Sequence, residues 1–166
     1  VLAYASPRRA DLLRAAGIAF EVIPSDADEA VFPAESPETY VQRVSAAKAT
    51  AVAPRAKGRV VLAADTIVVV DGRILGKPTG ADDARRMLQH LAGRAHQVIT
   101  GVTVAHLEVR TEIDTTTVEF MALSAEEVDW YVATGEGSAK AGGYGVQGLA
   151  SHFVTRIDGS YSNVVG

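Results

Sequence analysis

Residues 60–78 read Val-Val-Leu-Ala-Ala-Asp-Thr-Ile-Val-Val-Val-Asp-Gly-Arg-Ile-Leu-Gly-Lys-Pro, and the rest of the chain is expected to be organised around them. Its first part, 60–70, is a nearly continuous run of β-branched and aliphatic residues, which is typical of a strand buried on both faces in the middle of a sheet. The dipeptide Asp71-Gly72 that follows is a strong signal for a two-residue hairpin. We therefore expect residues 73–75 to fold back antiparallel to the central strand.

One charged residue, Asp65, interrupts the apolar run. A carboxylate in an apolar strand costs several kcal/mol unless a metal, a cation or hydrogen bonds offset the cost. The hairpin is expected to carry Lys77 towards the end of the sheet where Asp65 lies, which pairs a carboxylate with a cation. The functional interpretation is a reactive carboxylate, and the structural alternative is a strand-end residue bonded to backbone amides.

The composition limits the class of protein. A chain of 166 residues is long enough for one domain, or two closely packed lobes, with a substantial hydrophobic core. No apolar run approaches the roughly 20 residues that span a bilayer, and no signal peptide is visible, so we expect a cytoplasmic protein outside the membrane. Because the sequence begins with Val1 rather than Met, we expect at least one residue to be missing.

Cysteine usage and charge narrow the chemistry further. The absence of cysteine from the sequence excludes disulfides, thiolate zinc sites and cysteine nucleophiles, so any metal must be held by oxygen or imidazole. A net charge of −4 with dispersed basic residues argues against binding to duplex nucleic acid. Neither property argues against a nucleotide pocket.

The stretch Ser6-Pro7-Arg8-Arg9 has the features of a helix start. Ser6 is a good N-cap, and proline is favoured at the first helical position. A helix N-terminus offers free N–H groups and the positive end of the helix dipole, and two arginines follow at once, so we predict an anion site. Arg8 and Arg9 point in different directions, and one of them is expected to pair with a carboxylate. The alternative is a well-capped surface helix with solvated arginines.

Other segments have recognisable periodicity. Lys48 falls on the apolar face of a helix predicted over 37–52, where it either snorkels or reaches into a cleft. A capping box at Ser124 begins a later helix. The remaining predictions are strands at 1–4, 20–24, 95–105, 109–121 and 152–157, and helices starting near 7 and at 81–91.

Residues 140–148, Lys-Ala-Gly-Gly-Tyr-Gly-Val-Gln-Gly, form a glycine-rich loop. Four glycines permit close approach of the backbone to another group. Tyr144 and Gln147 are the natural side chains to bind a flat, hydrogen-bonding ligand. The loop lacks the Gly-Lys-Ser/Thr ending of a Walker A motif, and its spacing is not that of the dinucleotide fingerprint.

The unusual residues taken together suggest a polyphosphate ligand. Several cations accompany two carboxylates, Glu29 and Asp65, that are capable of binding a metal. Such a set suits a phosphate chain with its divalent ion, for which Mg²⁺ or Mn²⁺ fits best. Hydrolysis would also need a base to activate water, and Asp65 is the best-placed candidate.

The chain resembles the Maf family of nucleoside triphosphate pyrophosphatases over essentially its whole length, 1–166. The motifs that carry this resemblance occur in the family's order: Ser6-Pro7-Arg8-Arg9, Asp28-Glu29, Ala47-Lys48-Ala49, Ala64-Asp65-Thr66, Gly76-Lys77-Pro78, Gly93-Arg94-Ala95-His96, Lys140-Ala141-Gly142 and Gly145-Val146-Gln147-Gly148.

The resemblance implies hydrolysis of a nucleoside triphosphate between the α and β phosphates, with a divalent metal. Asp65 matches the family's catalytic proton acceptor. Arg8, Thr66 and Gln147 match positions tied to substrate choice in the branch that prefers dTTP and UTP, so pyrimidine triphosphates, including modified ones, are the expected substrates in a nucleotide-pool house-cleaning role. The other polar positions that match the family's cleft are phosphate or metal contacts. The resemblance implies phosphate contacts at Ser6, Arg9, Lys48 and Lys77, and metal ligands at Glu29 and Asp65.

The resemblance also implies a fold and an assembly, and this chain departs from the family's pattern at two points. Members are similar to the inosine triphosphate pyrophosphatases, with a mixed α/β fold, a long central sheet, a cleft between two lobes and commonly a homodimer. The family usually has serine where this chain has Tyr4, which puts pocket shape or selectivity in question. The family continues beyond Gly166 with a further segment, so the C-terminal end of this single domain is expected to be truncated.

Three other functions are considered. The same chemistry on a purine or 7-methylguanine nucleotide is disfavoured by Thr66 and Gln147. A non-catalytic nucleotide-binding regulator of septum formation or cell division would need the cations but not a carboxylate inside an apolar strand. Binding of single-stranded nucleic acid would need a basic groove lined by several aromatic residues, which the acidic balance and few aromatics disfavour.

Overall fold

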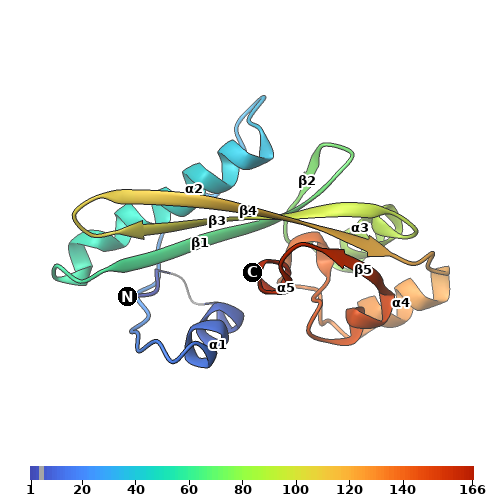
Figure 1. Cartoon of the computed structure of the whole chain (residues 1–166). Helices are drawn as coiled ribbons and strands as arrows, with labels where there is room; N and C mark the ends of the chain where they lie inside the picture. The colour runs from blue at the N-terminus through green and yellow to red at the C-terminus, as the bar shows by residue number, and fades with distance from the viewer. Residues whose placement is uncertain (4–5) are drawn as a thin grey trace. The chain divides into compact units, whose positions relative to one another are not determined.

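The computed structural model describes residues 1–3 and 6–166 and has a mixed α/β fold (Figure 1). Tyr4, the position that departs from the family's serine, lies outside the described residues. The elements in chain order are α1 (Pro7–Ala15), α2 (Pro37–Val52), η1 (Ala53–Ala56), β1 (Val61–Val70), β2 (Arg73–Leu75), α3 (Ala81–Leu91), β3 (Ala95–Ala105), β4 (Val109–Phe120), α4 (Ala125–Ala133), η2 (Ala141–Gly143), η3 (Leu149–Phe153), β5 (Val154–Asp158) and α5 (Tyr161–Val165).

The strands form a sheet in the order β2-β1-β3-β4-β5. The predicted hairpin is confirmed, because β2 runs antiparallel to β1 with Val68 opposite Leu75. Asp71 and Gly72 make the turn with φ of 49° and 71°, the left-handed values that such a turn requires. Leu2 adds isolated parallel bridges to Leu62 and to Val22, so the sheet is mixed.

Contacts divide the chain into two compact units, which are described separately. The first unit holds residues 1–66, 100–114 and 166, and the second holds 67–99 and 115–165. The strands β1, β3 and β4 each contribute residues to both units. Among the described residues, no helix is long and apolar enough to cross a membrane.

In the first unit, α2 packs along the strands (Figure 1). The core there consists of small side chains, with Ala49 and Val52 of α2 against Val61 and Ala63 of β1. A Cβ atom at Gly101 of β3 would lie 2.5 Å from the Val41 carbonyl oxygen, so only glycine lets this part of the helix approach the sheet. Close packing of α2 on the sheet is what brings its side chains to β1.

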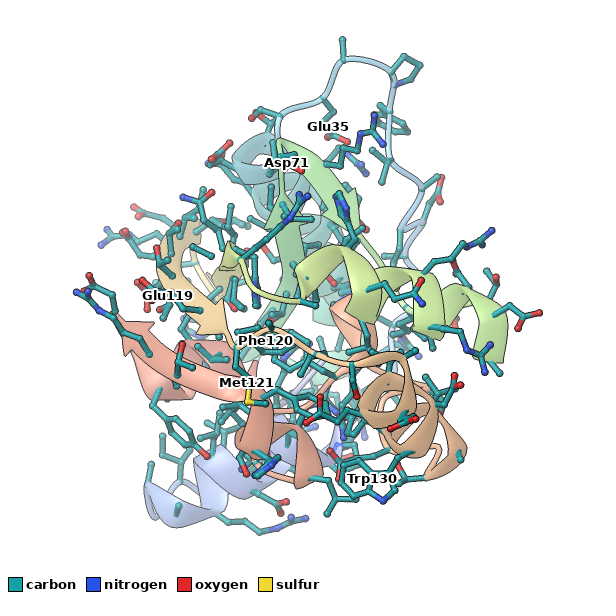
Figure 2. All side chains as sticks on the ribbon, turned by 90° about the vertical axis from the view of Figure 1, so that its right-hand side faces the viewer. Glu35, Asp71, Glu119, Phe120, Met121 and Trp130 are labelled. Atoms are coloured by element: carbon teal, nitrogen blue, oxygen red, sulfur yellow. The ribbon has the colours of Figure 1, made fainter. Side chains whose placement is uncertain are left out.

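The second unit has a larger, aromatic core. Phe120, Tyr131, Tyr144 and Phe153 pack edge to face around it, and α3 packs against both α4 and η2. Figure 2 shows Phe120 in the interior and Trp130 on the outer side of α4, where about half of the tryptophan is exposed. Aromatic packing of this kind buries a large apolar surface and fixes the geometry of the loops that cross the core.

Most predicted elements are confirmed, and the exceptions are local. The helices at 37–52 and 81–91 and the strand at 95–105 have the predicted bounds. The predictions of strands at 1–4 and 20–24 are wrong, because among the described residues of these two segments only Leu2 and Val22 make bridges. The last strand begins at Val154 rather than His152, since 149–153 form a short 3₁₀ helix. The five-residue helix α5 was not predicted, because it carries no periodic pattern.

Candidate functional site

Asp65 lies on β1 in a buried ion-pair cluster. The Lys48 ammonium donates a hydrogen bond to Asp65 Oδ1 at 2.6 Å and lies 2.9 Å from Glu29 Oε1. The Lys48 side chain is 1% exposed and that of Asp65 10%, whereas that of Glu29 is 39% exposed. The cluster therefore runs from the strand interior to the surface, with a buried cation joining two carboxylates.

The helix α2 delivers Lys48 to this position. Ser36 caps the helix, with its hydroxyl accepting a hydrogen bond from the Thr39 amide, and Pro37 takes the first position. Tyr40, Val44 and Lys48 follow at intervals of four, which places them on one face of the helix. All three are buried, so the reading of Lys48 as a side chain that snorkels to water is wrong.

The loop that carries Glu29 is fastened to α2 by Tyr40 and Arg43, two residues that the sequence did not single out as functional. The Tyr40 hydroxyl donates to the Glu29 carbonyl at 2.9 Å. Arg43 donates to the Ala30 carbonyl at 2.8 Å and to both carboxylate oxygens of Glu35, and its guanidinium lies over the Phe32 ring. These contacts fix the backbone on both sides of the Glu29 side chain.

Tyr40 keeps its proton in this setting. Burial, together with the negative charges of Asp65 and Glu29, raises the pKa of Tyr40 to about 12. The phenol is therefore a hydrogen-bond donor throughout the ordinary pH range. The only sequence signal that could have identified Tyr40 is its position on the same helix face as Lys48. An aromatic residue at such a position more often belongs to the core.

The start of α1 holds the second group of predicted residues. Ser6 is the predicted N-cap and accepts from the Arg9 amide at 3.4 Å. The Arg9 guanidinium donates to the Ala64 carbonyl at 2.7 Å and to Thr66 Oγ1 at 3.1 Å. Thr66 Oγ1 in turn lies 2.9 Å from Thr100 Oγ1. Arg9 thus contacts a carbonyl and a hydroxyl of β1.

Consecutive strand residues point to opposite faces, and the contacts follow this rule. Asp65 contacts α2 through Lys48, and Thr66 contacts α1 through Arg9. Figure 1 shows these two helices on different sides of the strands of the first unit. Arg8, half-buried, lies in the first turn of α1 beside Arg9.

Lys77 and Gln147 belong to the second unit, and both are exposed. Lys77 follows β2, and the carbonyl of its neighbour Gly76 accepts a hydrogen bond from the Gly142 amide at 3.0 Å. The segment that carries Lys77 and the glycine-rich loop that carries Gln147 are thereby joined within this unit.

The prediction that Tyr144 binds a flat ligand is wrong. Tyr144 is 5% exposed, and its hydroxyl lies 2.7 Å from His96 Nε2 in the aromatic core. The loop glycines accommodate protein groups. A Cβ atom at Gly142 would meet Val68 at 2.9 Å, and one at Gly148 would collide with the Glu136 carboxylate. The sequence pattern signals a close approach correctly, but the approaching groups are side chains of the same unit.

The cluster in the first unit is compatible with a divalent cation. Lys48 shows that the oxygens of Glu29 and Asp65 converge on one cation. Within the described part of the chain, no group of three or more acidic, histidine or cysteine side chains is arranged to hold a metal. Two carboxylates alone suit Mg²⁺, which typically takes one or two carboxylates and completes its shell with water and substrate phosphates.

The comparisons with known proteins show the family to which this chain belongs. The sequence model of the family described as Maf-like protein matches residues 1–166, so the chain belongs to that family. A dTTP/UTP pyrophosphatase of Syntrophomonas wolfei is 50% identical over 168 residues, covering 99% of this chain and 89% of the relative. A dTTP/UTP pyrophosphatase of Anaeromyxobacter sp. is 51% identical over 172 residues, covering 100% of this chain and 82% of the relative.

A solved structure supports the fold. The Ham1 protein of Staphylococcus aureus aligns with a TM-score of 0.50 and 16% sequence identity, covering 72% of this chain and 70% of that protein. The predicted mixed α/β fold is thereby confirmed.

Proposed function

We propose that this chain hydrolyses nucleoside triphosphates between the α and β phosphates and releases a nucleoside monophosphate and pyrophosphate. The observation that carries the proposal is the buried pair that Lys48 of α2 forms with Asp65 of β1, because a carboxylate placed in an apolar strand at such a cost needs a role. The relatives named dTTP/UTP pyrophosphatase support dTTP, UTP and modified pyrimidine analogues as the favoured substrates.

Asp65 is the proposed proton acceptor. Lys48 occupies Oδ1, so Oδ2 is the oxygen proposed to take a proton from water. The resulting oxygen nucleophile attacks the α-phosphorus, the bond from that phosphorus to the bridging oxygen breaks, and the bridging oxygen leaves with pyrophosphate. Lys48 holds the carboxylate in place, which contributes the orientation that a general base needs.

The proposed phosphate contacts are spread along the chain. In the first unit, Ser6 and Arg9 lie at the N-terminus of α1, where backbone N–H groups and the helix dipole favour an anion. Lys48 brings a further charge, and Lys77 is the corresponding cation of the second unit. We propose that these residues stabilise the charge that develops on the leaving pyrophosphate.

We further propose that Glu29 and Asp65 hold a Mg²⁺ or Mn²⁺ ion. When bound, such an ion supplies positive charge to the phosphate oxygens. The convergence of both carboxylates on the Lys48 ammonium supports the assignment.

Arg8, Thr66 and Gln147 are the proposed determinants of substrate choice. Gln147 carries both a donor and an acceptor, which matches the N–H and carbonyl edge of thymine and uracil. Thr66 is placed by its bond to Arg9, so its hydroxyl has a defined position on β1.

The assembly and location are also proposals. Apolar side chains are exposed on the hairpin of β3 and β4 in the first unit, with Leu107 91% and Val109 55% exposed, which supports self-association as a homodimer. A cytoplasmic location suits an enzyme that acts on the nucleotide pool.

The test is a panel of canonical and modified nucleoside triphosphates with Mg²⁺ or Mn²⁺, in which pyrophosphate and orthophosphate are detected separately. We expect pyrophosphate from dTTP and UTP, and none after chelation of the metal. Orthophosphate alone would mean attack at the γ-phosphate. Nucleotide binding without turnover would instead favour the non-catalytic regulator of septum formation.

A further inference from the structure

Gln147 lies near the tip of a tight turn in the second unit. The turn spans residues 145–148 and is closed by a hydrogen bond from the Gly148 amide to the Gly145 carbonyl at 3.2 Å. Val146 is buried and anchors the turn, whereas Gln147 is exposed. Gln147 is therefore the side chain that this turn presents to solvent, and its position depends on the contacts that hold the two ends of the turn.

Both ends of this turn are held by one hydrogen-bonded pair of side chains, the buried Tyr131 and the partly exposed Glu136. The Gly145 amide donates to the Tyr131 hydroxyl at 3.3 Å, and the Leu149 amide donates to Glu136 Oε2 at 2.9 Å. The Tyr131 hydroxyl donates to the other carboxylate oxygen, Glu136 Oε1, at 2.9 Å. The pair thus connects the residue before Val146 with the residue after Gly148.

The local sequence places this pair. Tyr131 lies in the last turns of α4 and is 1% exposed. Gly135, with φ of 70°, reverses the chain after the helix, and Glu136 follows at once. Gly148 leaves room for the carboxylate, since a Cβ atom there would collide with it. A side chain at residue 148 would push the turn away from Glu136.

Glu136 is suited to this role because it remains an acceptor. Burial acts to raise the pKa of Glu136, but hydrogen bonds from the Leu149 amide and Tyr131, with the Lys140 charge, hold that pKa below its usual value. Burial and the neighbouring carboxylate raise the pKa of Tyr131, so the phenol stays protonated. An ionised carboxylate accepting from an amide gives a charge-assisted bond, stronger than a neutral one.

We propose that Glu136 and Tyr131 are positioning residues that set the nucleotide selectivity of this chain by fixing the turn that presents Gln147. The inference rests on the proposed pyrophosphatase function and on the proposed role of Gln147. Neither side chain needs to touch the substrate, because each acts on the backbone that carries Gln147.

The test measures kcat/KM for dTTP and for dCTP, which differ at the base edge proposed to meet Gln147. The ratio of the two values does not depend on the folded fraction of a variant, so a stability loss alone leaves it unchanged. We expect Gln147→Ala and Glu136→Ala each to lower the ratio by about tenfold, the effect of losing one well-placed hydrogen bond between Gln147 and the base. The double variant should lower it no further than Gln147→Ala alone, since both changes remove one interaction.

Two substitutions at one position isolate the hydrogen bond. Leu149→Pro removes the amide that Glu136 binds and suits the first position of η3, whereas Leu149→Ala keeps that amide. We expect Leu149→Pro to lose selectivity and Leu149→Ala to keep it, and this pair decides the question if Glu136→Ala does not fold. Glu127→Gln, in the capping box of the same helix, is a control that should leave the ratio unchanged.

Two results would overturn the proposal in distinguishable ways. Wild-type selectivity in Glu136→Ala, or equally in Leu149→Pro, alongside lost selectivity in Gln147→Ala, would reject positioning by Glu136 and leave the pyrophosphatase function intact. A wild-type protein that forms no pyrophosphate from any nucleotide would reject both.

Discussion

Lys48 and Asp65 form a buried ion pair, with Nζ 2.6 Å from Oδ1, between the helix α2 and the strand β1. The same ammonium lies 2.9 Å from Glu29, whose carboxylate reaches the surface. The sequence shows a carboxylate and a lysine that are each out of place in an apolar setting, and the structure shows that each accounts for the other. The pair is therefore both a structural element and the centre of the proposed chemistry.

Breaking this pair should destabilise the protein. Lys48→Met leaves the Asp65 carboxylate buried with its partner removed, so we expect the free energy of unfolding to fall by about 3 kcal/mol or more in chemical denaturation. Adding Asp65→Asn should recover part of the loss, because it removes the uncompensated charge. Lys57→Met, at an exposed lysine, is the control. A Lys48→Met protein as stable as the wild type would contradict the buried pair.

Tyr40 should make stability depend on alkaline pH. Its pKa rises from 10.0 to about 12 on folding, so the unfolded chain loses the proton first, and the stabilisation is present below pH 10 and lost as the pH rises towards 12. Tyr40→Phe should weaken this dependence and cost about 1 kcal/mol at neutral pH through the lost bond to Glu29. Denaturation curves across this range provide the measurement, with the exposed Tyr161→Phe as control. If the free energy of unfolding fell equally steeply with alkaline pH in Tyr40→Phe and the wild type, the raised pKa of Tyr40 would be contradicted.

His96 should make stability depend on acidic pH. Burial lowers the pKa of His96 from 6.5 to about 4. The unfolded chain therefore binds the proton first, and the stabilisation is complete above pH 6.5 and lost as the pH falls towards 4. The loss is at most about 3 kcal/mol. His96→Gln should remove this part of the acid dependence, whereas the exposed His152→Gln should retain it. Equal acid dependence in the two variants would show that His96 titrates normally.

Glu29 should contribute to cation binding. Isothermal titration of Mn²⁺ into the protein with a non-hydrolysable α,β-methylene analogue of dTTP reports binding without turnover. We expect Glu29→Gln to lower the affinity for Mn²⁺ about tenfold, since one of the two carboxylates is lost. Asp26→Asn, in the same acidic loop, should bind as the wild type does. If Glu29→Gln bound Mn²⁺ unchanged, Glu29 would orient water or the loop instead.

The sequence predicted the regular elements well because their periods and end signals are local. Capping serines, the hairpin dipeptide and the apolar run each decide structure within a few residues. The contacts of the site are different, because they depend on packing between distant segments. Tyr144 was misplaced, since a tyrosine among glycines has the same pattern whether it faces a ligand or the core.

Two further residues were missed for related reasons. Tyr40 occupies a helix position that an ordinary core aromatic would fill, so its bond to the Glu29 carbonyl becomes visible only in three dimensions. Glu136 follows a helix-ending glycine, where an acidic residue is typical of a solvated loop. Its bonds to Tyr131 and Leu149 require the loop at 145–149 to fold back over α4.

The most direct test of the account is pyrophosphate release from dTTP and UTP by the wild type, by Asp65→Asn and by the matched control Asp114→Asn at an exposed strand aspartate. We predict that Asp65→Asn loses turnover by a factor of about 100 or more, the usual contribution of a general base, while it still binds nucleotide. Asp114→Asn should retain wild-type turnover. Pyrophosphate release by Asp65→Asn at the wild-type rate would contradict the central claim.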